Sequence, residues 1–282
     1  MSIERVSGVN LPRLESETSP EGEKKVLTKI LVISGPSYSG KDLAAKILNQ
    51  RYGWTIEDGR ERFERRTGIE TGHMERSEEI HKRFDGFQAE FFRKAKPADA
   101  GIWQTRLGGI ILAEQRDRRA RAIKDRQWAQ QKGRIQPELG LIPAVSILLW
   151  ARKDVRVDRA YNVSLDSWEQ QIANLKQGSV TPAKPTKVGI EARMEERAQR
   201  DIEDWAPLHS KYIEVGKDPF SSTLSRPNGG PVYDKFIDTS DKTPDEVANE
   251  IVEMAHALGA IESNDNGREY SLNLGEPISP GQ

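Results

Sequence analysis

Short apolar runs alternate with longer amphipathic stretches along most of this chain. Runs such as KILVIS and AVSILLW are apolar throughout rather than at every second position, which is typical of parallel strands covered on both faces. The stretches between them, such as KDLAAKILNQRY and PDEVANEIVEMAHAL, carry apolar residues at helical spacing. This alternation predicts an α/β domain built on a parallel sheet. The expected strands lie at 29–34, 54–57, 101–105, 144–150 and 235–239.

The two ends of the chain differ in composition from the middle. Residues 1–25 are rich in Ser, Glu, Pro and Gly, and residues 262–282 are similar, so we expect a disordered leader and a flexible tail around a folded domain at 26–261. The first residues lack the apolar core of a signal peptide. No apolar run approaches the roughly 20 residues of a membrane span. We therefore expect a cytoplasmic protein with no membrane partner.

Two long charged stretches interrupt the alternation, and a third region has helical periodicity. Residues 113–137 predict an exposed helix with an Arg/Lys-rich surface, either a solvated face or a binding surface for phosphate, nucleic acid or a second subunit. Residues 176–189 predict a loop before a highly charged helix at 190–205. Residues 75–95 have helical periodicity. The apolar side chains on one side of this last helix, either core or in one case a platform for a base, are Ile80, Phe84, Phe87 and Phe91.

Composition narrows the chemistry. The 43 basic and 44 acidic residues leave a net charge of −1, so nothing attracts the whole chain to nucleic acid, which we do not expect as a partner. The absence of cysteine excludes disulfides, cysteine-based zinc sites and a thiol nucleophile. The four histidines are scattered without the spacing of metal ligands.

The stretch GPSYSGK at 35–41 fits the phosphate-binding pattern G-x-x-x-x-G-K. It follows an apolar strand and opens an amphipathic helix, as the motif requires. The glycines let successive backbone N–H groups point at a phosphate, and the helix adds its positive N-terminal end. Lys41 then reaches the terminal phosphates of a nucleotide. The residues expected to hold ATP here are Gly35, Pro36, Ser37, Tyr38, Ser39, Gly40, Lys41, Asp42 and Leu43.

Asp42 departs from this motif, because Ser or Thr normally follows the lysine. That hydroxyl is a neutral ligand of Mg²⁺ beside the anionic phosphates. A carboxylate can also bind Mg²⁺ through oxygen, although it repels the nucleotide. Alternatively, Asp42 only interacts with the N-terminus of its helix, where an acidic side chain is favoured.

Several further segments resemble the cytidylate kinases, in particular the compact archaeal-type enzymes of the nucleoside monophosphate kinase group. SGPSYSGKD is similar to their G-P-x-G-S-G-K-[GS]-[TS] loop and departs from it at Tyr38 and Asp42. WTIEDGRERFERRTGI resembles the strand and turn that bring an arginine to the acceptor phosphate, and WQTRLGG resembles the end of their third strand. AVSILLWARKDVRVDRA and EERAQRDIEDW resemble the movable lid, and YDKFIDTSDKTPDEVANEIVEM resembles the closing strand and helix. The resemblance covers about 28–258, with insertions near 113–142 and 213–231.

This resemblance implies a fold and an activity. The fold is a three-layer α/β/α P-loop NTPase fold with a five-stranded parallel sheet, a helical acceptor-binding region at 58–100 and a lid at 152–215. The activity is transfer of the γ-phosphate of ATP, with Mg²⁺, to a nucleoside monophosphate, with CMP or dCMP the leading acceptors.

The resemblance also assigns roles to single residues. The loop lysine and two lid arginines serve catalysis, and two earlier arginines hold ATP. An arginine of the turn after the second strand holds the acceptor phosphate, with three candidates. The catalytic residues are then Lys41, Arg197 and Arg200; Arg156 and Arg159 bind ATP; and the acceptor side comprises Asp58, Arg60, Arg62, Arg65, Asp85, Arg106 and Asp201. The expected metal ligand, Asp42, rests on its carboxylate and not on the resemblance.

A second departure from the family lies at the end of the third strand. Gln104 and Thr105 stand where the family has a Glu or Asp that helps to place the metal or the acceptor. In one hypothesis an acid has moved from this strand end to Asp42 in the loop, which keeps the local charge and predicts that Asp42→Ser lowers activity. In the opposite hypothesis the chain still holds a nucleotide but no longer transfers phosphate.

Three functions therefore stay open. The leading one is a nucleoside monophosphate kinase for CMP or dCMP. The second is a P-loop kinase for another small acceptor. The third is a nucleotide-binding regulatory protein without kinase turnover, whose partner surface is the basic helix at 113–137. A kinase consumes ATP only when its acceptor is present, whereas a regulator binds nucleotide without such a rate.

Overall fold

The computed structural model of this chain describes residues 25–69, 78–131, 142–176, 179–214 and 216–263. Apart from their inner edges, the leader predicted at 1–25 and the tail predicted at 262–282 lie outside the described residues.

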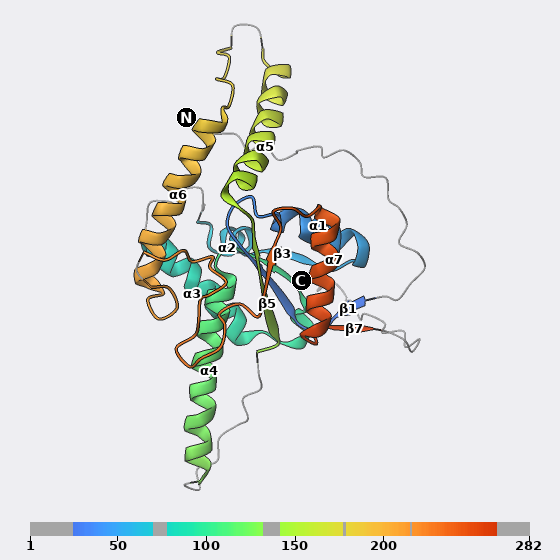
Figure 1. Ribbon diagram of the computed structural model, residues 1–282. Helices are drawn as coiled ribbons and strands as arrows, with labels where there is room; N and C mark the ends of the chain where they lie inside the picture. Colours follow the sequence, from blue (N-terminus) through green and yellow to red (C-terminus); the bar gives the residue numbers. More distant parts are fainter. Residues whose placement is uncertain (1–24, 70–77, 132–141, 177–178, 215, 264–282) are drawn as a thin grey trace, which may run out of the picture.

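The centre of the fold is a sheet of five parallel strands in the order β3-β4-β2-β5-β6 (Figure 1). Each strand overlaps an apolar run that predicted it, so the five-stranded parallel sheet is confirmed. The central strand, β2, is buried at every position because helices cover both faces of the sheet. The strands are β2 (Ile30–Ser34), β3 (Ile56–Asp58), β4 (Gly101–Gln104), β5 (Ala144–Trp150) and β6 (Lys235–Asp238).

Helices α1 (Lys41–Tyr52) and α7 (Pro244–Ala257) cover one face of the sheet (Figure 1). Leu31 and Ile33 of β2 lie in one buried cluster with residues of both helices. Helix α7 begins with a capping box, in which Thr243 accepts from the backbone of Glu246 and the Glu246 carboxylate accepts in return.

Helices α3 and α4 cover the opposite face. Because side chains alternate along a strand, Ile30 and Val32 of β2 point to this side and share a buried cluster with Phe92 of α3 and Leu112 of α4. The two helical layers around the sheet confirm the three-layer α/β/α architecture. The helices of this layer are α3 (Glu78–Lys94) and α4 (Gly108–Gln131). Helix α2 (Gly59–Thr67) precedes α3 in the chain, and a short 3₁₀ turn (Pro97–Asp99) follows it.

Helix α4 begins earlier than the exposed helix predicted at 113–137. Its first turns, with Ile110 and Ile111, are buried against the sheet, and only its second half projects from the body as a charged helix (Figure 1). The first turns of α4 are apolar all round, so they lack the alternation of apolar and polar positions that predicts a helix. The helical pattern therefore appears only in the charged residues further along the chain. Residues 132–137 lie outside the described part.

Helices α5 (Lys153–Ala173) and α6 (Lys187–Leu208) form a pair that extends away from the sheet (Figure 1). Val157, Ala160 and Ile190 are buried between them. The charged helix predicted at 190–205 starts three residues earlier, because the Thr186 hydroxyl caps it by accepting from the Gly189 N–H at 3.1 Å. This helical pair occupies the region predicted as the lid.

Two short strands at the outer limits of the described residues, β1 (Lys25–Leu27) and β7 (Ile261–Ser263), pair in a small antiparallel ribbon. The innermost residues of the predicted leader and tail, Lys25 on one side and Glu262 and Ser263 on the other, lie in this ribbon. No helix in the described ranges combines the length and apolar character that a membrane crossing needs.

Candidate functional site

A cleft of about 850 Å³ opens where the carboxyl ends of the parallel strands meet. Its walls come from the loop after β2, the starts of α1 and α2, the end of β4, and helices α3, α5, α6 and α7. The structure brings most of the predicted site residues into this one space. Those that line the cleft are Ser37, Tyr38, Gly40, Lys41, Asp42, Leu43, Asp58, Arg60, Asp85, Arg106, Arg159, Arg197, Arg200 and Asp201.

The phosphate loop is held in a tight curl between β2 and α1. Gly35 has φ +151°, and a Cβ there would collide with the Leu149 carbonyl oxygen, so glycine is required. Gly40 adopts φ +93° directly before α1. Ser39 is buried, and its carbonyl oxygen accepts from the Thr239 hydroxyl at 2.8 Å. The loop backbone is therefore anchored to the strand end of β6 behind it.

Tyr38 is the one described non-glycine residue with a left-handed backbone, at φ 64°. L-residues adopt this conformation at a cost, and such strain tends to gather at functional sites. Tyr38 is 39% exposed and lines the cleft. The sequence marked this position as unusual, and the structure places it at the turn of the loop.

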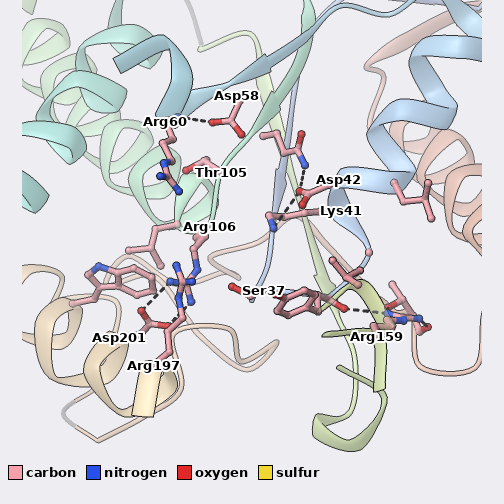
Figure 2. A pocket seen from close by; sticks show the side chains of 18 of the residues that line it. Ser37, Lys41, Asp42, Asp58, Arg60, Thr105, Arg106, Arg159, Arg197 and Asp201 are labelled. Carbon is pink, nitrogen blue, oxygen red and sulfur yellow. Dashed lines mark hydrogen bonds and ion pairs between the residues drawn. The ribbon is translucent and has the colours of Figure 1, made fainter. Parts of the chain in front are cut away.

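Lys41 and Asp42 start helix α1 and point into the cleft (Figure 2). Lys41 Nζ lies 3.3 Å from Asp42 Oδ1, and the Gln104 side-chain amide donates to the same oxygen from the end of β4. The Lys41 side chain is only 12% exposed, whereas that of Asp42 is 73% exposed. Asp42 Oδ2 has no hydrogen-bond partner among the described residues.

The donor set suits a cation that arrives with a nucleotide. Mg²⁺ is commonly held by one or two carboxylates together with substrate phosphates and water. Asp42 supplies one exposed carboxylate oxygen beside the phosphate loop. Within the described residues, no group of three or more His, Asp or Glu side chains forms a self-sufficient metal site. Asp42 therefore suits a Mg²⁺ ion that phosphate groups and water also hold.

The turn after β3 distinguishes the three candidate arginines. Asp58 caps α2 by accepting from the backbone N–H groups of Arg60 and Glu61, at 2.8 and 3.1 Å. Arg60 lines the cleft (Figure 2). Arg62 instead lies over the ring of Phe91, 4.8 Å from its centroid. Arg65 pairs outside the cleft with Glu57 at 3.3 Å.

Arg106 is held by a two-pronged contact with Asp201 of α6 (Figure 2). Its Nη1 donates to Asp201 Oδ1 at 2.9 Å, and its Nη2 donates to Oδ2. The guanidinium also lies 4.8 Å from the ring centroid of Trp205. Burial raises the pKa of the Asp201 carboxyl, and the charge of Arg106 opposes that rise. Arg106 is thus preorganised beside Arg197 and faces Lys41 across the cleft.

The two arginines predicted to hold ATP are placed differently. Arg159 lies at the phosphate loop and donates to the Thr239 hydroxyl at 3.0 Å and to the Thr239 carbonyl at 2.6 Å. Arg156 does not line the main cleft. It lines a second cavity of about 160 Å³ behind the loop, where Arg106 and Arg197 also contribute. Arg156 Nε donates to the Ala151 carbonyl oxygen at 3.1 Å.

Several residues of the cleft were not singled out from the sequence as site residues. On the side of α3 and α6 the cleft has aromatic and polar walls, and on the side of α7 it has an apolar edge. A lone His, Trp or Pro carries no motif, so only the fold could gather them. The added lining residues are His81, Leu107, Asn162, Val163, Asp204, Trp205, Thr239, Lys242, Pro244 and Val247.

No protein-family model matches this chain, and no curated protein sequence matches it. Among solved structures, an uncharacterized protein from Eubacterium ventriosum is 14% identical with a TM-score of 0.43, over 81% of this chain and 99% of that chain. A shikimate kinase from Acinetobacter baumannii in complex with shikimate is 14% identical with a TM-score of 0.42, over 82% and 94%. A shikimate kinase from Bacteroides thetaiotaomicron is 11% identical with a TM-score of 0.41, over 82% and 98%. Likeness at this level identifies neither a family nor a substrate, and the resemblance to cytidylate kinases stays a prediction.

Proposed function

We propose that this protein is a P-loop kinase that transfers the γ-phosphate of ATP to a pyrimidine nucleoside monophosphate, CMP or dCMP. One observation carries the proposal. The phosphate loop with Lys41 and the predicted arginines of the acceptor and lid regions line a single cleft, facing one another (Figure 2). The arginines of this set are Arg60, Arg106, Arg197 and Arg200.

In phosphoryl transfer the protein mainly positions the two substrates and supplies positive charge. The two phosphates must lie in line, and the charge that spreads over the transferred group must meet fixed cations. Lys41 supplies one cation from the donor side. Arg197 and Arg200 supply more from α6, and their planar forks suit phosphate oxygens.

The ATP side of the cleft follows from the loop. The triphosphate would lie along the backbone from Ser37 to Lys41. The adenosine end would extend toward Arg159 and the apolar edge of α7, where Pro244 and Val247 line the cleft.

The acceptor side lies between α2, α3 and α6. Arg60 and Arg106 offer charge for a monophosphate, and Phe84 and Trp205 offer flat apolar surface for a ring. The sequence left open whether one aromatic of α3 serves binding, and Phe84 is the one at the cleft. The choice of a pyrimidine comes from the resemblance to cytidylate kinases.

Asp42 would hold the Mg²⁺ that comes with ATP. When bound, the ion neutralises charge on the phosphates and polarises the transferred group. Gln104 would orient the Asp42 carboxylate through its amide. The contact between these two side chains supports the hypothesis that the acid moved from the end of β4 to the loop.

A kinase for another small acceptor is the second candidate. Arg106 already has a carboxylate partner, and Asp58, Asp85 and Asp204 also line the acceptor side. Carboxylates accept hydrogen bonds from hydroxyl groups, so this wall also suits a hydroxyl-rich acceptor.

The deciding experiment measures acceptor-dependent ADP formation. Purified protein receives Mg-ATP with CMP, dCMP, UMP, AMP or GMP in turn. Lys41→Ala should abolish the rate, whereas Lys46→Ala, an exposed lysine of the same helix, should leave it unchanged. A rate with CMP or dCMP establishes the proposal. ATP binding without a rate from any monophosphate would contradict it and favour another acceptor or a regulatory protein.

A further inference from the structure

His209 lies buried at the junction of three helices, just after the last turn of α6. Its side chain is 4% exposed. Nδ1 lies 2.8 Å from Glu114 Oε1 of α4, and Nε2 lies 3.2 Å from Asp85 Oδ2 of α3. The ring therefore joins the end of the lid helix to two helices of the core layer.

The geometry selects the charged form of this ring. A neutral imidazole has one N–H, so one of the two carboxylates would face a lone pair, whereas imidazolium donates to both. Burial alone would lower the pKa of His209, but the two carboxylates outweigh it and raise the pKa to about 9.

Other charged groups surround this contact from each neighbouring element. On α4, Arg118 lies 3.9 Å from Glu114 Oε2, the oxygen that His209 does not contact. After α6, the Tyr212 hydroxyl donates to Asp117, which Arg226 approaches at 3.5 Å. On α3, His81 lies 3.8 Å from Asp204 of α6. The ring of His209 is thus the cation placed between the Asp85 and Glu114 carboxylates.

Asp85 connects this buried contact to the cleft. It lines the cleft beside Phe84, whereas His209 and Glu114 do not. Within the described residues, His209 is the one hydrogen-bond partner of Asp85, through Oδ2. Oδ1 is therefore available to a ligand on the acceptor side.

We propose that His209 is a positioning residue for the acceptor: as imidazolium it fixes the Asp85 carboxylate, whose other oxygen accepts a hydrogen bond from a hydroxyl or amino group of the acceptor. This inference rests on the proposed kinase function. The contact of His209 with Asp85 also bears on helix α6, which ends just before His209 and carries Arg197 and Arg200. The same ring that orients Asp85 holds the acceptor helix α3 against the helix that supplies those arginines.

The first test is independent of turnover. A histidine titration by NMR on the full chain follows its four imidazoles, and His209→Gln identifies the signal of His209. We expect His209 to stay protonated well above pH 7, and Asp85→Asn or Glu114→Gln to move its titration to lower pH. A titration near the ordinary value of about 6.5 would overturn the contact.

The second test measures whether substitutions at His209 and Asp85 change the KM of the acceptor or that of ATP. With CMP as the acceptor, His209→Gln and Asp85→Asn should each raise the acceptor KM about tenfold and leave the ATP KM unchanged. The double variant should be no worse than the poorer single variant, because His209 acts through Asp85. His256→Gln, at an exposed histidine of α7, is the matched control.

The outcomes separate the two proposals. If the effects of His209→Gln and Asp85→Asn on the CMP KM multiply in the double variant, or if the KM of ATP rises as much as that of CMP, His209 is merely structural. Either result would overturn the inference. Absence of turnover with every monophosphate would contradict the proposed function and, with it, the acceptor role of Asp85. The NMR titration would still decide whether the charged contact exists.

Discussion

The Gln104 side-chain amide at the end of β4 donates a hydrogen bond to Asp42 at the start of α1, across 62 residues of sequence. These are the two positions at which the chain departs most clearly from the kinase pattern that it resembles. An amide stands where an acid is expected, and an acid stands where a hydroxyl is expected. Their contact means that one carboxylate is still present at this point of the cleft.

This contact predicts a reciprocal effect of two substitutions. Asp42→Ser should lower kcat/KM about 10- to 100-fold, because the carboxylate that would hold the metal is lost. Adding Gln104→Glu to Asp42→Ser should recover a large part of the rate, since it returns the acid to the strand end. The Mg²⁺ dependence of ADP formation measures both. Equal activity of Asp42→Ser and the wild type would contradict the hypothesis that the acid moved from the end of β4 to the phosphate loop.

Arg60 should be the arginine of the turn that matters for the acceptor. Arg60→Ala should raise the acceptor KM about tenfold or more, because a charge-assisted contact at the cleft is lost. Arg65→Ala is the matched control and should leave KM unchanged, because Arg65 pairs with Glu57 outside the cleft. Steady-state kinetics with varied CMP make the comparison. The reverse ranking would place the acceptor elsewhere.

Arg62 should matter for stability and not for the acceptor. Its guanidinium lies over Phe91 and Trp103, so Arg62→Ala should lower the free energy of unfolding by about 1 kcal/mol and leave the acceptor KM unchanged. Urea denaturation measures the first effect. A changed KM with unchanged stability would contradict this placement.

His209 should make stability depend on pH above neutrality. Its folded-state pKa of about 9 lies above the ordinary value, so its stabilising contribution is complete below about pH 6.5 and is lost as pH rises through 9. The contribution is up to about 3 kcal/mol. Urea denaturation from pH 6 to 9.5 should show a steeper fall for the wild type than for His209→Gln. Parallel curves would contradict the charged contact.

Tyr38 should reveal the backbone strain of the phosphate loop. Tyr38→Gly and Tyr38→Ala both remove the ring, but only glycine adopts φ 64° without cost. The glycine variant should therefore exceed the alanine variant by about 1 kcal/mol in free energy of unfolding. Urea denaturation of the two variants tests this. Equal stability would show that the loop relaxes when the ring is lost.

Much of the fold could be predicted from the sequence because it depends on neighbouring residues. Apolar runs of strand length and helical spacing between them place β2, β5 and α1 almost to the residue. The phosphate loop is equally local, since Gly35, Gly40 and Lys41 act within one turn. The start of α4 was missed for the same reason, because an apolar helix turn has no local stripe to mark it.

Only the tertiary structure decided how the cleft is assembled. Sequence spacing left Arg60, Arg62 and Arg65 equivalent, and the direction of helix α2 sends one of them to the cleft. The family resemblance predicted that Arg156 binds ATP, and the fold places its side chain in the second cavity, which Pro36 and Ser37 of the phosphate loop also line. The contact of His209 with Asp85 spans 124 residues and carries no motif. Such pairs arise because packing helices on a sheet brings distant side chains within a hydrogen bond of each other, which no local pattern records.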